Sequence, residues 1–251
     1  MTGPVAGASP RRLARLAGAL YLINIIGGAF AIGVVPALLF TSDPATTAAN
    51  IQAHELLYRS GLAAHLVVTV TNVPLAVIFY ELFKVVNRRL ALLGAFFILV
   101  GTAIEAAGLL DQFMPLVLLG GEPYASALPA AQLQALAQLS VDLSPIDYTL
   151  HTVFFGADII CFAYLILRSA FLPRTIGILL AVDGLAYLAY SFTAVLAPGF
   201  AAQLDPWIRL PALLGEGSLC LWLLVVGLDV ERWKKWAGAP VQTPTRQLEA
   251  L

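Results

Sequence analysis

SPIDYTLHTVFFGADIICFAYLILR, residues 144–168, is an apolar run long enough to cross a bilayer, yet it contains Asp147, His151 and Asp158. At about 100° per residue these three side chains fall within roughly 40° of one another on a helix. A charge near the middle of a membrane is costly, and such residues usually face a protein interior or a wet cavity. We therefore expect this helix to turn its polar face towards other helices of a bundle.

The composition of the whole chain also suggests a protein that lies in a membrane. The chain has 251 residues, of which 60% are hydrophobic and 12% charged, and its mean hydropathy is +0.86. These values exclude a soluble domain of this length and indicate a membrane protein, with the lipid bilayer as its first partner. The basic residues are neither clustered on one face nor interleaved with aromatics, so we expect no nucleic-acid partner. Cys161 and Cys220 lie in apolar runs and are expected to be small core residues rather than a disulfide framework or a zinc site.

Six apolar runs predict an all-α, polytopic fold, a six-helix transmembrane bundle that forms a single domain over residues 13–236. The predicted spans cover about 13–40, 57–83, 90–112, 146–168, 173–197 and 210–230. Ser42 or Asp43 can cap a surface helix that begins at Pro44. Residues 129–139 are predicted to form a separate short helix that lies on the membrane surface or covers the end of the bundle, and 198–209 an outer loop. Residues 1–12 are expected to be a cytoplasmic segment and 237–251 a flexible cytoplasmic tail.

Basic residues set the orientation of these spans. The positive-inside rule places both termini in the cytoplasm of a multi-pass protein of the cell membrane. Only Arg59 and Arg209 fall on the outer side of the six-helix arrangement. The residues on the inner side are Arg11, Arg12, Arg15, Lys84, Arg88, Arg89, Arg168, Arg174, Arg232, Lys234, Lys235 and Arg246.

The third run carries a stripe of small residues. Gly94, Gly101, Glu105, Gly108 and Gln112 share one helical face. Small residues let transmembrane helices approach closely, so a glycine stripe that includes a carboxylate is typical of a packed, buried face.

Ionisable side chains on several predicted spans lie at similar depth and form a candidate buried polar core. The main candidates are His65, Glu105, His151, Asp158 and Glu216, and the secondary polar positions are Asn24, Asn72, Asp183 and Tyr187. We expect His151 and Asp158 to face Glu105, His65 and Glu216 across the bundle.

Three interpretations of this core stay open. It can bind or translocate a small ligand, an ion, a lipid or a proton through a cavity between the helices. It can be the centre of a metal-dependent membrane hydrolase acting on a lipid-like substrate, with ligands drawn from His65, His151, Asp158 and Glu105. Neither HExxH nor HxxxH occurs in the chain. Alternatively, the polar groups pair only to set helix register, as in a structural or partner-binding subunit. The sequence assigns no cofactor, no catalytic residue and no oligomeric state.

Several segments resemble the bacterial membrane family known as domain of unknown function 4386. They are RRLARLAGALYLINIIGG at 11–28, DPATTAANI at 43–51, LLYRSGLAAHL at 56–66, NRRLALLGAFF at 87–97, VFFGADIICFAYLILRSAFLPRTIGILLAVDGLAYL at 153–188 and GEGSLCLWLLVVGLDVERW at 215–233. The resemblance implies a multi-pass inner-membrane protein and no particular reaction, ligand or cofactor. Members often have histidine where this chain has Asp158, a departure that weakens a strict metal-site interpretation.

Overall fold

The structure is a computed structural model that describes residues 9–121 and 127–238, and in these ranges every regular element is a helix. The prediction of an all-α fold is confirmed over these residues. The tail at 239–251 and the first eight residues, part of the predicted N-terminal segment, lie outside the described residues. The elements are α1 (Pro10–Gly28), η1 (Ala29–Val34), α2 (Val35–Leu39), α3 (Pro44–Ala53), α4 (Glu55–Leu119), α5 (Ala130–Ser169), α6 (Arg174–Leu196), α7 (Pro198–Val225) and α8 (Val230–Gly238).

The long helix α4 is folded back on itself. Asn87 has extended backbone angles, φ −154° and ψ 105°, and its side chain accepts a hydrogen bond from the Leu90 amide at 3.1 Å, as an N-cap does. A straight helix would separate His65 from Glu105, 40 residues later, by about 60 Å, yet their side chains lie 3.0 Å apart. The two halves of α4 therefore run antiparallel, as the two predicted runs at 57–83 and 90–112 require.

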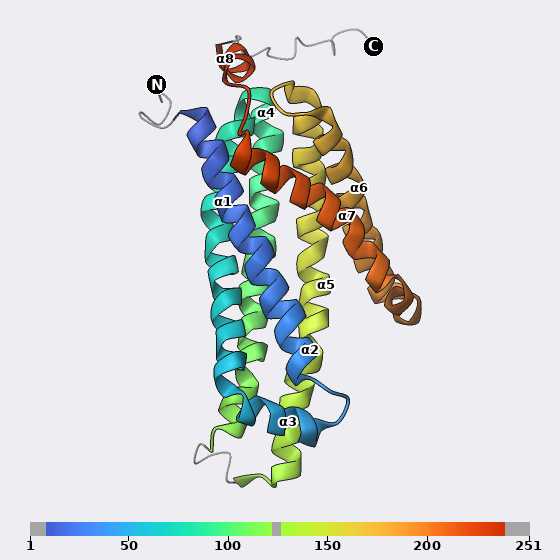
Figure 1. The fold of residues 1–251 in the computed structure, drawn as a ribbon. Coiled ribbons are helices and arrows are strands. Elements are labelled where there is room, and N and C mark those ends of the chain that lie inside the picture. The colour runs from blue at the N-terminus through green and yellow to red at the C-terminus, as the bar shows by residue number, and fades with distance from the viewer. Residues whose placement is uncertain (1–8, 122–126, 239–251) are drawn as a thin grey trace.

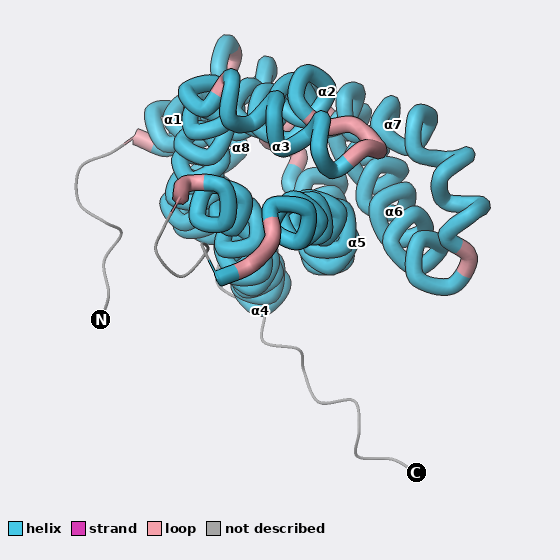
Figure 2. Tube along the Cα trace, turned by 90° about the horizontal axis from the view of Figure 1, so that it is seen from below, coloured by secondary structure: helices cyan, strands magenta, loops and turns pink. Residues whose placement is uncertain are grey.

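The long helices pack in a ring. α4 packs on α5, α5 on α6 and α6 on α7, while α1 packs on both α4 and α7. Figure 1 shows the start of α1, the turn of α4, the α5–α6 connection and α8 at one end of the bundle, with α3 at the other. Seen from the α3 end, α4, α5, α6 and α7 follow one another across the molecule (Figure 2). A ring of this kind leaves an interior that several helices share.

Four helical segments are long and apolar enough to cross a membrane: Pro10–Leu39, Glu55–Leu119, Ala130–Ser169 and Arg174–Leu196. A fifth candidate is the pair Leu210–Val225 and Val230–Gly238, which is bent by 96°. The bend lies at Gly227, whose φ of 80° is the left-handed conformation that glycine adopts at low cost. α7 therefore ends before the predicted boundary at 230, and the amphipathic α8 is held by the Trp233 indole, which donates to the Leu82 carbonyl at 2.9 Å.

Two connections differ from the sequence prediction. The short helix predicted over 129–139 is continuous with the next span in α5, because Pro145 sits inside the helix without ending it. Transmembrane helices contain internal proline more often than soluble helices do. Residues 198–209, predicted as an outer loop, form the first turns of α7, which begins with Pro198 at a position where proline favours a helix start.

The surface helix α3 starts as predicted. The Asp43 carboxylate accepts hydrogen bonds from the Thr46 amide at 2.9 Å and the Thr46 hydroxyl at 2.5 Å. These two bonds lower the pKa of Asp43, because they stabilise its charged form. The capped helix lies across the end of the bundle and packs on α4 and α5.

Helices α1 and α7 touch at one end and diverge towards the other. A Cβ at Gly18 would lie 2.5 Å from the Leu224 backbone nitrogen, so only glycine permits this crossing. Arg15 strengthens it by donating to the Val225 carbonyl at the end of α7, at 3.1 Å. At Gly28 and Gly217 an added Cβ would meet nothing within 4 Å. The two helices form a V that opens towards α3, as Figure 1 shows.

The contact between α5 and α6 also depends on glycine and gives a test of the packing. A Cβ at Gly184 would lie 2.8 Å from the Gly156 carbonyl oxygen, on backbone that cannot give way. We expect Gly184→Ala to lower the free energy of unfolding by about 1–3 kcal/mol, because overpacking outweighs the gain in helix propensity of at most about 1 kcal/mol. Gly199→Ala, where nothing lies within 4 Å, should leave stability equal or higher. The midpoint of thermal unfolding in detergent measures both; equal midpoints would contradict the close approach.

Candidate functional site

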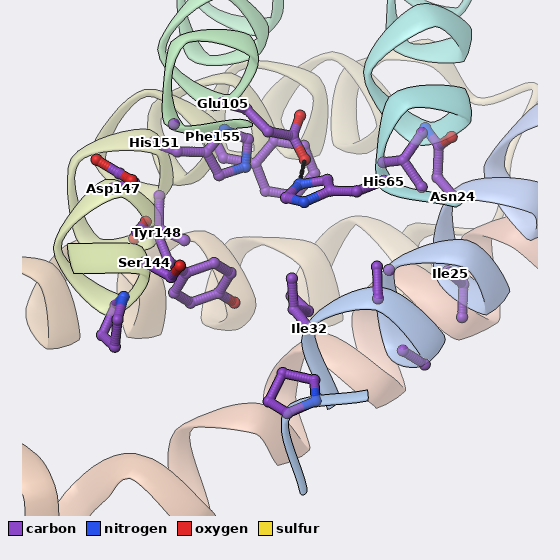
Figure 3. A pocket seen from close by; sticks show the side chains of 18 of the residues that line it. Asn24, Ile25, Ile32, His65, Glu105, Ser144, Asp147, Tyr148, His151 and Phe155 are labelled. Carbon is purple, nitrogen blue, oxygen red and sulfur yellow. Dashed lines mark hydrogen bonds and ion pairs between the residues drawn. The ribbon is translucent and has the colours of Figure 1, made fainter. Parts of the chain in front are cut away.

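A cavity of about 890 Å³ lies inside the ring of helices, on the α3 side of the α1–α7 crossing. Its walls come from α1, η1, α2, both halves of α4, α5, α6 and α7. Of the main polar candidates, His65, Glu105, His151 and Glu216 line it, whereas Asp158 does not. Figure 3 shows His65 and Glu105 facing His151 and Asp147. The volume is within the range of about 300–1,000 Å³ that small-molecule sites occupy.

A chain of hydrogen bonds crosses from α1 to both halves of α4 on one wall of the cavity. Asn24 Nδ2 donates to Asn72 Oδ1 at 2.5 Å, and Asn72 Nδ2 donates to Glu105 Oε2 at 3.2 Å. His65 Nε2 lies 3.0 Å from the other carboxylate oxygen of Glu105, and its Nδ1 lies 3.1 Å from the side-chain oxygen of Gln112. The predicted faces of the second and third runs therefore meet, and Glu105 is satisfied on both oxygens.

Glu216 joins three helices on the opposite wall. Tyr21 of α1 donates its hydroxyl to Glu216 Oε2 at 2.7 Å, and Tyr187 of α6 donates to Oε1 at 2.9 Å. Glu216 is 8% exposed and lines the cavity. Both contacts are hydrogen bonds from neutral groups, and no described Lys or Arg forms an ion pair with this carboxyl group.

Two further carboxyl groups lie behind Glu216, away from the cavity wall. Asp158 is 4% exposed and Asp183 is fully buried, and both interact electrostatically with Glu216. Asp158 Oδ2 and both carboxyl oxygens of Asp183 have no hydrogen-bond partner among the described residues. Three buried carboxylates without a counter-ion would be strongly unfavourable, so this group must hold protons or a cation. We call Asp158, Asp183 and Glu216 the carboxyl cluster.

Aromatic rings on α5 and α6 link the two walls. The His151 ring stacks on Phe155 with centroids 5.2 Å apart, and Phe155 meets Tyr187 edge-on at 5.9 Å. Tyr148 lies 6.3 Å from His151 on the other side, so these rings form a row that leads to the tyrosine on Glu216. Figure 3 shows Tyr148, His151 and Phe155 together at the cavity.

The structure divides the predicted polar core into two groups. His65 and Glu105 meet with Asn24 and Asn72, whereas Glu216 meets Tyr187 and lies near Asp158 and Asp183. His151 belongs to neither group: its Nδ1 lies 3.1 Å from the Gly101 carbonyl oxygen. Asp158 is two helical turns from His151, about 10 Å along the axis, which removes it from the cavity.

The hydrolase interpretation gains no support from this geometry. Its four ligand candidates are separated, since only His65 and Glu105 are in contact. Across 9–121 and 127–238, no three His, Cys, Asp or Glu side chains are grouped so that they could hold a metal ion.

Sequence analysis did not single out Tyr21 or the Tyr148 ring. The spacing in the sequence could have identified both residues. Tyr21 lies three residues before Asn24 and Tyr148 three residues before His151, so each shares a helical face with a predicted polar residue. The glycine stripe of the third run is confirmed as a buried contact face: a Cβ at Gly94 would strike Phe162 at 2.8 Å, and one at Gly108 would lie 2.8 Å from the Asp147 carboxylate.

Comparison with known proteins places the chain in one family. The family model described as "Domain of unknown function (DUF4386)" matches residues 16–227. No curated protein and no solved structure matches the chain.

The pair formed by His65 and Glu105 can be tested by a double-mutant cycle. We expect His65→Leu or Glu105→Leu alone to cost about 3–5 kcal/mol of unfolding free energy, because each leaves a buried polar partner unsatisfied. The double replacement should cost less than the sum of the two. Arg59→Ala, which breaks an exposed pair with Glu55, should cost less than about 1 kcal/mol. Chemical unfolding in detergent gives the four values, and strict additivity would show that His65 and Glu105 act independently.

Proposed function

We propose that this chain, which belongs to the DUF4386 family, crosses the cell membrane six times with both termini in the cytoplasm and binds a small ligand in its cavity. The family assignment carries no activity, so the proposal rests on the geometry of the cavity. The observation that carries it is a large interior space whose walls hold ionisable side chains from α4, α5 and α7. Membrane proteins bury such side chains at depth mainly where they serve a ligand, ion or proton site.

Helix geometry supports six crossings. α1 with η1 and α2, the two halves of α4, and α5 run between the end of the bundle that holds α8 and the end that holds α3 (Figure 1). α6 starts and α7 finishes at the α8 end, and the connection between them lies at the side of the bundle, short of α3. An even number of crossings brings the start of α1 and α8 to the same end. The described basic residues of α1, the α4 turn, the α5–α6 connection and α8 also gather there, which makes this the cytoplasmic end by the positive-inside rule.

The V between α1 and α7 gives the cavity a way in from the side. Gly28, Ala29, Ala31 and Ile32 line it on one arm and Leu213 and Gly217 on the other. Residues 29–34 are wound as a π-helix, a geometry that often occurs at functional sites. With the proposed topology this opening lies in the outer half of the membrane, where an amphiphilic ligand could pass between lipid and cavity.

The proposed topology predicts labelling from opposite sides. In a background in which Cys161 and Cys220 are replaced by alanine, Ala45→Cys on α3 should react with a membrane-impermeant thiol reagent in intact cells. Thr175→Cys at the start of α6 should react only after the cells are permeabilised. The opposite pattern would invert the topology, and labelling of both in intact cells would contradict an α6 that starts inside.

Water access to the cavity can be tested on α1 itself. Ala31 is 8% exposed and lines the cavity, whereas Ile26 is 61% exposed on the outer face of the bundle, which we assign to lipid. In the same cysteine-free background we expect Ala31→Cys to react with a water-soluble thiol reagent and Ile26→Cys to stay unreacted, because a thiol in hydrocarbon does not ionise. Mass spectrometry of the intact protein measures the labelled fraction. Equal reactivity of the two would remove the basis for an aqueous cavity.

A further inference from the structure

The charge of the cavity selects the class of ligand. Among the described side chains that line it, three carry carboxyl groups, Glu105, Asp147 and Glu216, and none is Lys or Arg. An anionic ligand would find only repulsion at these positions, whereas a cation would gain from each. Most of the remaining lining is aliphatic or aromatic, so the ligand that fits has an apolar body as well as a positive charge.

Of these three carboxyl groups, Glu216 is the one in contact with aromatic side chains, those of Tyr21 and Tyr187. Glu105 is already bonded to His65 and Asn72, whereas Glu216 accepts bonds only from the neutral hydroxyls of Tyr21 and Tyr187. The aromatic row on α5 leads to the same point, and aromatic faces attract cations, especially in a desolvated site. An organic cation at Glu216 would therefore meet one carboxylate and several ring faces.

Among the described side chains, Glu216 has no positively charged partner. The titratable groups around it are acidic or neutral: Tyr21 from α1, Asp158 and Cys161 from α5, Asp183 and Tyr187 from α6, and Cys220 on its own helix. Across the cavity, α4 contributes Glu105, already paired with His65, and α5 contributes His151. With two unpartnered buried carboxyl groups behind it, the carboxyl cluster needs a positive charge close by, and a proton is the smallest one available.

We propose that the cavity binds a lipophilic organic cation at Glu216 and that this cation replaces a proton held by the carboxyl cluster. The inference rests on the proposed function, since it requires a cavity that admits ligands. In the exchange one O–H bond of a carboxyl group breaks, the proton passes to water and one positive charge takes its place. The net charge of the site is the same with the proton bound and with the cation bound. Neither form therefore has to bury an additional uncompensated negative charge.

Two probes of the same shape and opposite charge test the charge selectivity. Tetraphenylphosphonium and tetraphenylborate are to be titrated into the purified full chain in nanodiscs, with empty nanodiscs as the blank. We expect the cation to bind saturably and the anion to bind no more than it does to the blank. Binding of both probes, or of the anion alone, overturns the inference.

The proton exchange has its own signature. If one proton leaves for each cation that binds, the affinity for tetraphenylphosphonium should rise by up to about tenfold for each pH unit. Calorimetry in two buffers of different ionisation heat gives the number of protons released. An affinity that does not change with pH, or one that changes with sodium instead, overturns the exchange.

The site within the cavity is tested by Glu216→Gln, which keeps hydrogen-bonding capacity towards Tyr21 and Tyr187. We expect at least about a tenfold loss of tetraphenylphosphonium affinity and no remaining pH dependence. Glu55→Gln, an exposed carboxyl group paired with Arg59 outside the cavity, is the matched control and should bind as the unmodified chain does. Unchanged binding by Glu216→Gln overturns the assignment. If this variant does not fold, the probe pair and the pH series on the unmodified chain decide.

The labelling experiment separates this inference from the proposed function. If Ala31→Cys is labelled but the chain binds no cation, this inference is wrong and the proposed function stands. If Ala31→Cys is not labelled, the proposed function is wrong.

Discussion

The hydrogen bonds from Tyr21 and Tyr187 to Glu216 connect α1, α6 and α7 at one buried carboxyl group. Glu216 is buried, so its carboxyl group must find its donors inside the protein. These two bonds hold α1 against α6 and α7, to which no loop connects it. The same junction forms the wall where the cavity ends and the carboxyl cluster begins.

Polar groups on the two walls of the cavity are satisfied to different degrees. On the wall formed by α1 and α4, the polar side chains form a connected network in which Glu105 is paired with a histidine. Its members are Asn24, Asn72, Glu105, His65 and Gln112. A fully satisfied network of this kind rigidifies the helices that it joins. In the carboxyl cluster three acidic groups gather with oxygens left unpartnered. The network on α1 and α4 therefore stabilises the bundle. The carboxyl cluster lacks a positive charge, which a cationic ligand or a proton can supply.

Much of the fold follows from sequence, because apolar length and helical period are local properties. The stripe from Gly94 to Gln112 and the polar faces of His65 and Asn72 were predictable from spacing alone. The separation of the polar core into two groups could not be predicted from spacing, because the depth of a side chain along its helix does not determine which neighbouring helix it contacts. His151 and Asp158 share a face of α5, yet Gly101 is the partner of the first and Glu216 the neighbour of the second. Such partners are set by the angles at which helices cross. The continuity of α5 through Pro145 was also hidden, since proline usually ends a helix in sequence patterns.

Some glycines of this bundle allow close backbone contacts, whereas others face open space. Comparing the two kinds shows where the bundle can open. At Gly18, Gly156 and Gly184 the absent side chain allows backbones to touch, so these contacts tolerate no movement apart without leaving a void. At Gly28, Gly33 and Gly217 the absent side chain faces open space. α1 is tight near its start, whereas Gly28 and Gly33 face open space. Beyond the π-helical turn the chain is held again, because Val35 and Leu39 are buried and the Asn50 amide donates to the Leu39 carbonyl at 3.1 Å. Motion that admits a ligand should therefore be concentrated in residues 28–34, where the π-helical turn replaces the regular hydrogen-bond ladder, while the crossing with α7 and the end near α3 stay fixed.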